Sequence, residues 1–191
     1  MQSNQMSLNR IRQQFAENIE HSMKAAELLP EAILAAGNSL LASLLDGGRI
    51  FSAGSGDGAQ LSTLFASLLL RGQGQRPPLP AWDLTASVTT DQHGSNATAA
   101  LHAFGQRGDI LLLTQPDSVM AEQLTGAAHD RDMTVILIIP MSDNTIAMKC
   151  RAQDIPVIIP ADSSLRTREI TLLVIHSLCD HIEQQLFGDL S

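Results

Sequence analysis

The sequence predicts an α/β fold, namely a doubly wound and mainly parallel five-stranded sheet with helices on both faces. From about residue 49 onward, short apolar segments alternate with longer amphipathic runs, which is the order of strand and helix in such a sheet. The segments at 110–114 and 134–139 are almost continuously apolar, as expected for strands covered on both faces. The predicted strands are Ile50–Ala53, Pro80–Leu84, Ile110–Thr114, Thr134–Ile139 and Pro156–Ile159.

Two helices are predicted before the first strand. The first carries apolar residues spaced three or four apart, which is typical of one helix face. Pro30 suits the first turn of the second helix, and Gly47-Gly48 ends it. Because no strand precedes them, we expect a helical hairpin over 7–46 rather than a crossover. The residues of the first apolar face are Leu8, Ile11, Phe15, Ile19 and Met23.

The remaining helices complete a single domain over 1–191. Helical runs are predicted at 59–70, 97–104 and 119–130 and near Ile146, and a last helix at 163–187. We find no repeat and no linker, so the α/β core at 49–160 and the terminal helices belong to one unit.

Composition limits the possible functions. The chain has 191 residues, of which 44% are hydrophobic and only 17% charged, so we expect some apolar surface to be covered by other subunits. The net charge of −8 and an aromatic content of 3% argue against direct contact with nucleic acid. Cys150 and Cys179 lie in no CxxC or zinc-like spacing, so free thiols are predicted.

The ends and the hydropathy predict a soluble cytoplasmic protein. The N-terminal segment is polar, which is unlike a signal peptide. No apolar run reaches the roughly 20 residues of a membrane helix. Neither a metal nor another cofactor is expected.

Three polar loops follow predicted strands, where open α/β sheets bind ligands. They are GSGDGA at 54–59, TQPDSV at 114–119 and ADSSLRTRE at 161–169. Closely spaced glycines let a backbone turn sharply and offer amide groups to an anion. The sequence therefore predicts an anion cleft, with candidate residues Gly54, Ser55, Gly56, Asp57, Thr114, Ser118, Ser164 and Arg166.

Charged residues within these loops leave alternatives open. Asp57 and Gln60 form the D-x-x-Q pattern of a helix-capping box, so Asp57 is predicted to cap the next helix and fill the anion cleft. Ser118 is placed as an N-cap, and Asp117 adds a second carboxylate. Arg166 is expected either to pair with an anion or to neutralise one of these two aspartates.

The order of these segments resembles the SIS (sugar isomerase) domain. The resemblance rests on the strand, glycine loop and helix at 49–65, RPPLPAWDL at 76–84, GDILLLTQPDS at 108–118 and VIHSLCDHIEQQLF at 174–187. Within that superfamily the chain is similar to phosphoheptose isomerases and to their non-enzymatic relative, the DnaA initiator-associating protein DiaA. The likeness covers nearly the whole chain.

The resemblance implies which isomerase residues are kept. The family uses a serine in the first loop, a histidine and a glutamate on the next helix, and a glutamine and a histidine on the last, often with a metal. These fall on Asp57, Thr63, Ser67, Arg168 and His176, so only the last histidine survives. Proton transfer between sugar carbons needs both a base and an acid. The resemblance therefore implies that catalysis is lost and that His176 is a relic.

The expected function is accordingly that of a non-catalytic SIS-domain adaptor. By resemblance to DiaA, it would form a homotetramer, bind the initiator DnaA and promote timely initiation of chromosome replication. Leu186 and Phe187 match the apolar pair that contacts DnaA in that group, although they could equally pack onto the domain. The alternatives are an active phosphoheptose isomerase acting on sedoheptulose 7-phosphate and a phosphosugar-binding sensor.

Overall fold

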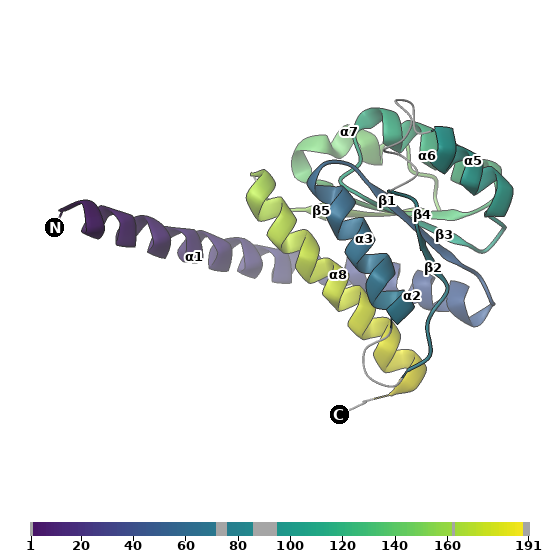
Figure 1. The fold of residues 1–191 in the computed structure, drawn as a ribbon, viewed down its shortest axis with the longest axis horizontal. Helices are drawn as coiled ribbons and strands as arrows, with labels where there is room; N and C mark the ends of the chain where they lie inside the picture. Colours follow the sequence, from purple (N-terminus) through teal and green to yellow (C-terminus); the bar gives the residue numbers. More distant parts are fainter. Residues whose placement is uncertain (1, 72–75, 86–94, 162, 189–191) are drawn as a thin grey trace.

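A five-stranded parallel sheet in the order β2-β1-β3-β4-β5 forms the centre of the protein, which confirms the predicted fold class (Figure 1). The structure is a computed structural model that describes residues 2–71, 76–85, 95–161 and 163–188. The strands are β1 (Ile50–Gly54), β2 (Ala81–Asp83), β3 (Ile110–Thr114), β4 (Thr134–Pro140) and β5 (Ile155–Ile159).

Helices cover both faces of this sheet. One face carries α2 (Pro30–Leu45), α3 (Asp57–Arg71) and α8 (Ser164–Phe187). The other carries α5 (Ser95–Phe104), α6 (Ser118–Asp130) and the short α7 (Asn144–Ala147), which follows a 3-10 turn at Met141–Asp143.

The strands are apolar because helices cover both faces of the sheet. Successive side chains of a strand point to opposite faces. Ile110 and Leu112 of β3 accordingly join the core under α3 and α8, whereas Leu111 and Leu113 join the core under α5 and α6. Both sets are buried, so this strand has no polar face.

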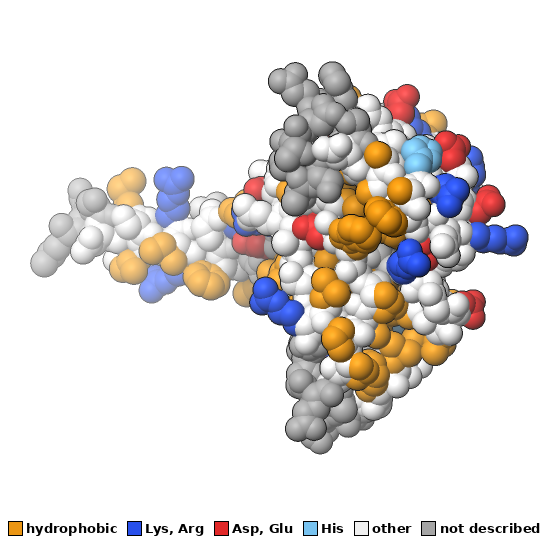
Figure 2. All heavy atoms as spheres, turned by 45° about the vertical axis from the view of Figure 1, so that its right-hand side comes forward, with side chains coloured by type: hydrophobic (Ala, Val, Ile, Leu, Met, Phe, Trp, Pro, Cys, Tyr) orange, Lys and Arg blue, Asp and Glu red, His pale blue; other side chains and the backbone are white. Residues whose placement is uncertain are grey.

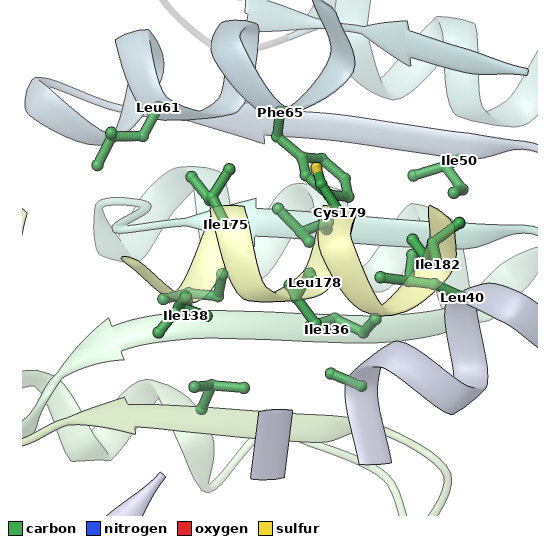
Figure 3. Close-up of a cluster of buried hydrophobic side chains, with 14 of the residues drawn as sticks. Leu40, Ile50, Leu61, Phe65, Ile136, Ile138, Ile175, Leu178, Cys179 and Ile182 are labelled. Carbon is green, nitrogen blue, oxygen red and sulfur yellow. The ribbon is translucent and has the colours of Figure 1, made fainter. Parts of the chain in front are cut away.

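The first of the two cores lies between α8, α3 and the sheet (Figure 3). Phe65 of α3 meets Cys179 of α8 at its centre, with Ile175 and Ile182 on either side along α8. All four side chains are at most 1% exposed. This packing aligns α3 and α8 and thereby brings their N-terminal ends to the same edge of the sheet.

The two predicted N-terminal helices are present, but they do not fold back on each other. Helix α1 (Gln2–Leu28) and α2 meet at a bend of 65°, and α1 projects from the body (Figure 1). Only Leu29 separates them. Its N–H donates to the Ala25 carbonyl and its carbonyl accepts from the Ile33 N–H, so backbone hydrogen bonds continue across the joint. One residue is too short for the reversal that a helical hairpin needs.

The projecting helix keeps its apolar face open to solvent. The predicted stripe from Leu8 to Met23 is present, and Phe15 is 70% exposed. Of the helices that the structure describes, none alone has the length and hydropathy of a membrane span; α1 and α2 meet that test only when taken together as a bent pair.

Candidate phosphosugar site

The glycine loop after β1 and the loop after β3 are joined at the carboxyl edge of the sheet. Gly54 lies opposite Thr114 in the parallel register. The Ser55 hydroxyl donates to the Gln115 carbonyl at 3.1 Å and accepts the Asp117 N–H at 2.8 Å. Two of the three predicted loops therefore form one structure, and Ser55 connects them.

Close backbone approach explains the glycines of the first loop. A Cβ on Gly58 would lie 2.0 Å from the Thr114 carbonyl oxygen, and one on Gly54 would lie 2.5 Å from the Gly58 carbonyl. Gly56 has a φ of 53°, in the left-handed region that glycine adopts without strain. The Thr114 hydroxyl is buried and donates to the Gly58 carbonyl at 2.9 Å, so Thr114 holds the loop in shape.

Arg168 is the cation that reaches the glycine loop. Its Nη2 donates to Gln60 Oε1 at 2.6 Å, and its Nη1 lies 3.4 Å from Asp57 Oδ1. Helix α3 begins at Asp57 itself, and none of the hydrogen bonds found between described residues joins the Asp57 carboxylate to a backbone amide. The predicted capping box is therefore wrong, because Asp57 lies in the first turn of the helix and pairs with Arg168.

Arg166 serves a different purpose from the one expected. Its side chain is 5% exposed and donates to Gln14 Oε1 at 2.6 Å and to Glu169 Oε2. Burial acts to raise the pKa of Glu169, but hydrogen bonds from Asn18 and Arg166 outweigh it and hold that pKa below its ordinary value. Arg166 therefore attaches α8 to α1, and in this structure it neutralises neither Asp57 nor Asp117.

The cap of α6 differs from the sequence prediction by one residue, and α8 begins one residue later than the predicted 163. Asp117, not Ser118, caps α6 and accepts the Met120 N–H at 2.9 Å. Ser163 caps α8 by accepting the Arg166 N–H at 3.3 Å. Ser118 and Ser164 are thus the first residues of their helices, with exposed side chains near the loops.

A second polar cluster lies beside the loops, and the sequence reasoning missed it. Asp83 ends β2 opposite Ser52 of β1. Its Oδ2 accepts from the Thr63 hydroxyl at 2.7 Å, and its Oδ1 accepts the Thr85 N–H at 2.9 Å. The signal was the carboxylate in AWDL, at the carboxyl end of a predicted strand.

Other predicted residues lie apart from these clusters. His176 is exposed on α8, and Leu186 and Phe187 are half-buried against the core under α8. Among the described residues, no three His, Cys, Asp or Glu side chains come close enough to hold a metal ion. The described part of the chain therefore does not fit the metal that often accompanies the isomerase residues of that family.

Known proteins share both sequence and structure with the chain. It is 37% identical over 190 residues to a phosphoheptose isomerase of Shewanella frigidimarina, an alignment that covers 94% of this chain and 96% of the relative. The chain belongs to the phosphoheptose isomerase family. A Shewanella denitrificans member is 36% identical, with 94% and 97% of the two chains covered. No protein-family model matches the sequence.

Solved isomerase structures agree with this assignment. The phosphoheptose isomerase of Francisella tularensis superimposes with a TM-score of 0.85 at 31% identity and covers 93% of this chain and 98% of its own. That of Neisseria gonorrhoeae gives a TM-score of 0.82 at 27% identity, covering 92% and 98%. The fold of the isomerase family therefore extends over nearly the whole chain.

These relatives overturn the expected function. The sequence reasoning predicted a non-enzymatic adaptor that binds DnaA in replication initiation, whereas relatives at 35–37% identity carry the name of an enzyme. The likeness to DiaA in particular is not shown, and no DnaA partner is supported. The structure adds a physical reason, since Leu186 and Phe187 pack against the core instead of forming a free apolar knob.

Proposed function

We propose that the protein is a phosphosugar isomerase that interconverts the ketose and aldose forms of a seven-carbon sugar phosphate. The observation that carries this proposal is the joined pair of loops at the carboxyl edge of the sheet, with Arg168 beside them, in a chain of the phosphoheptose isomerase family. Backbone amides at the start of α3 and a nearby guanidinium are groups that bind phosphate.

Phosphate would bind at the glycine loop, from Gly54 to Gly56. The positive end of the α3 dipole lies there, and Arg168 supplies the countercharge. Ser118 and Ser164, exposed at the first positions of α6 and α8, would add hydroxyl groups.

Asp57, which pairs with Arg168, is the carboxylate that competes most directly with phosphate. A carboxylate about 4 Å from a unit negative charge repels it by about 1–4 kcal/mol at effective dielectrics between 80 and 20. The side chains of Asp57 and Arg168 are 46% and 42% exposed, and such an exposed pair contributes only about 0–1 kcal/mol. A charged hydrogen bond from Arg168 to phosphate contributes about 1.5–3 kcal/mol. The proposal therefore requires the exposed Asp57 carboxylate to turn toward solvent, so that phosphate replaces it as the partner of Arg168.

The test is turnover of sedoheptulose 7-phosphate by the purified protein, followed by ¹³C NMR. The proposal predicts appearance of the aldose phosphate, with no reaction of the unphosphorylated sugar. Arg168→Gln should raise KM by about 10-fold or more, because a charged hydrogen bond to phosphate is lost. A wild-type protein that binds no sugar phosphate and turns over none would contradict the proposal.

We also propose that the protein is a homo-oligomer, which α1 holds together. Its apolar stripe has no cover within the described chain: Ile11, Phe15 and Ile19 are each at least 55% exposed. Figure 2 shows hydrophobic side chains along this projecting helix. An apolar groove of about 490 Å³ lies at its base, lined in part by Leu34 and Leu173, which are 52% and 50% exposed. The tetrameric state and the cytoplasmic location stay predictions.

A further inference from the structure

An isomerase needs a group that takes a proton from carbon, and the carboxylates at the loops are not equally free to do so. Asp57 is paired with Arg168, at 3.4 Å between Oδ1 and Nη1. Asp117 caps α6 with its Oδ1. Asp83 is a further carboxylate near this edge of the sheet, and the function proposed above gives it no role.

Asp83 is held in one orientation by neutral donors. Thr63 Oγ1 lies 2.7 Å from Oδ2, the Thr85 N–H lies 2.9 Å from Oδ1, and the buried Ser62 hydroxyl lies 3.5 Å from Oδ1. Within the described part of the chain, no Lys, Arg or His forms an ion pair with it. Asp83 is thus a half-buried carboxylate with fixed geometry and an unneutralised charge.

Its place relative to the glycine loop suits the far end of the substrate. Thr63 follows Asp57 by six residues of α3, a rise of about 9 Å along the helix axis. The same side of the sheet carries Ser52, which pairs with Asp83 and contacts α3 through the Ser62 carbonyl. A seven-carbon sugar whose terminal phosphate is bound at the loop has a comparable length, so a substrate that lies along α3 would place its first two carbons beside Thr63 and Asp83.

We propose that Asp83 is the catalytic base of the isomerisation, an inference that rests on the function proposed above. The carboxylate removes a proton from C1 of the ketose, and the C1–H electron pair becomes the C1=C2 bond of an enediol as the C2 carbonyl oxygen takes up a proton from solvent water. The Asp83 carboxyl then returns a proton to C2, the O1 hydroxyl gives its proton back to solvent water, and the aldehyde forms at C1.

The test compares the wild type with Asp83→Asn in D₂O and measures deuterium incorporation into the sugar phosphate together with kcat. Asparagine has nearly the same shape and can still accept the Thr85 N–H, so the turn after β2 is retained while the basic carboxylate is lost. We expect kcat and deuterium incorporation to fall by about 10²–10⁴-fold, the usual contribution of a general base, with KM and Tm unchanged. Asp130→Asn, an exposed carboxylate at the end of α6, is the matched control and should behave as the wild type.

A second variant keeps the test decisive if Asp83→Asn does not fold. Asp83→Glu keeps a carboxylate but moves it by one methylene, and a misplacement of about 1 Å reduces the rate by up to about 10²-fold. Partial activity in Asp83→Glu supports the inference. Full activity in a folded Asp83→Asn protein overturns the role of Asp83 alone and leaves the isomerase proposal intact. No turnover and no exchange by the wild type overturns both.

Discussion

Arg168 and Asp57 form an ion pair at the opening of the glycine loop, and their exposure decides how the pair behaves. Both side chains are more than two-fifths exposed, so water screens their attraction. A ligand phosphate competes for Arg168 at little cost, since only a surface contact of Asp57 is given up. In the proposed phosphosugar site, the pair would therefore tune affinity without closing the site.

The first residue-scale prediction concerns Asp57. Asp57→Asn should lower KM for a seven-carbon sugar phosphate by about 2- to 5-fold, because the competing carboxylate of an exposed pair is removed. Steady-state kinetics with sedoheptulose 7-phosphate measures this change. Asp132→Asn, at an exposed turn, controls for net charge. A KM that rises in Asp57→Asn would show that the carboxylate helps to bind the sugar.

The second residue-scale prediction concerns the two thiols. Burial, aided by the charge of Glu183 and opposed by that of Arg76, raises the pKa of Cys179 to about 12. Burial and the charge of Asp154 also raise the pKa of Cys150, which is less buried. Because the thiolate is the reactive form, an aromatic disulfide reagent at pH 8 should modify Cys150 slowly and Cys179 only after unfolding. Equal reaction of both thiols in the native protein would contradict this expectation.

At the scale of elements, the start of α3 packs directly on the end of β3. Gly58→Ala would place a Cβ 2.0 Å from the Thr114 carbonyl oxygen. That oxygen belongs to the backbone and the Cβ is fixed by the helix, so neither atom can rotate away. We expect the free energy of unfolding to fall by about 3 kcal/mol or more, at the upper end of typical overpacking. That corresponds to a decrease in Tm of about 6–12 °C for a chain of this length.

Gly126 provides the matched control for that substitution. It lies in α6, where an added Cβ would meet nothing within 4 Å. Gly126→Ala should therefore stabilise the protein by about 0.5–1 kcal/mol, the helix propensity difference between glycine and alanine. Thermal unfolding of both variants checks the pair, and equal effects of the two substitutions would show that the loop can adjust.

The contact between α1 and α8 gives a pH dependence at the same scale. The folded-state pKa of Glu169 is lowered from 4.5, so its contribution to stability is present above about pH 4.5 and is lost as the pH falls through the lowered pKa. Hydrogen exchange of residues 14–21 should accordingly rise in acid relative to the core. Glu169→Gln should flatten this dependence, whereas Glu20→Gln, exposed on α1, should leave it unchanged.

At the scale of the whole molecule, contacts within a single chain do not explain why α1 carries an exposed apolar face. An apolar stripe as long as that of α1 is rarely left open to water. Burying each of its Ile, Met or Phe side chains contributes about 1.5–3 kcal/mol. The polar network around Arg166 fixes the direction in which α1 leaves the body. A second copy of the chain, which carries the same stripe, is therefore the partner that would bury the apolar face of α1.

The corresponding prediction is that Phe15→Glu, and separately Ile19→Glu, converts the oligomer into smaller species. A charge in the middle of a buried apolar contact is costly without a partner. Light scattering coupled to gel filtration measures the mass, and Tm should also become less dependent on protein concentration. Gln13→Glu adds the same charge on another face of α1 and should keep the oligomer. A wild-type protein that is monomeric at all concentrations would contradict this proposal.

Much of the fold was predictable because local patterns carry it. The apolar runs of β3 and β4 predicted buried parallel strands, and the order of segments predicted the layers. The boundary of a helix depends on single hydrogen bonds, so Asp117 rather than Ser118 was found as the cap only in the structure.

The candidate site was predictable only as a set of loops. Glycine spacing predicted the turn at 54–58, since close backbone approach leaves few alternatives. The positions of Arg166 and Arg168 differ by two residues on one helix, so they point in different directions, and the sequence did not show which one faces the loop. The family resemblance was right, whereas the inferred loss of catalysis was wrong.

The sequence by itself determined the order of strands and helices, the glycine turn and the apolar stripe of α1, because each follows from neighbours along the chain. Only the tertiary structure decided that Arg168 faces Asp57, that Arg166 joins α8 to α1, and that Asp83 meets Thr63. These pairs are separated by 111, 152 and 20 residues. No local pattern encodes such contacts, because they arise from how α3, α8 and the sheet pack together.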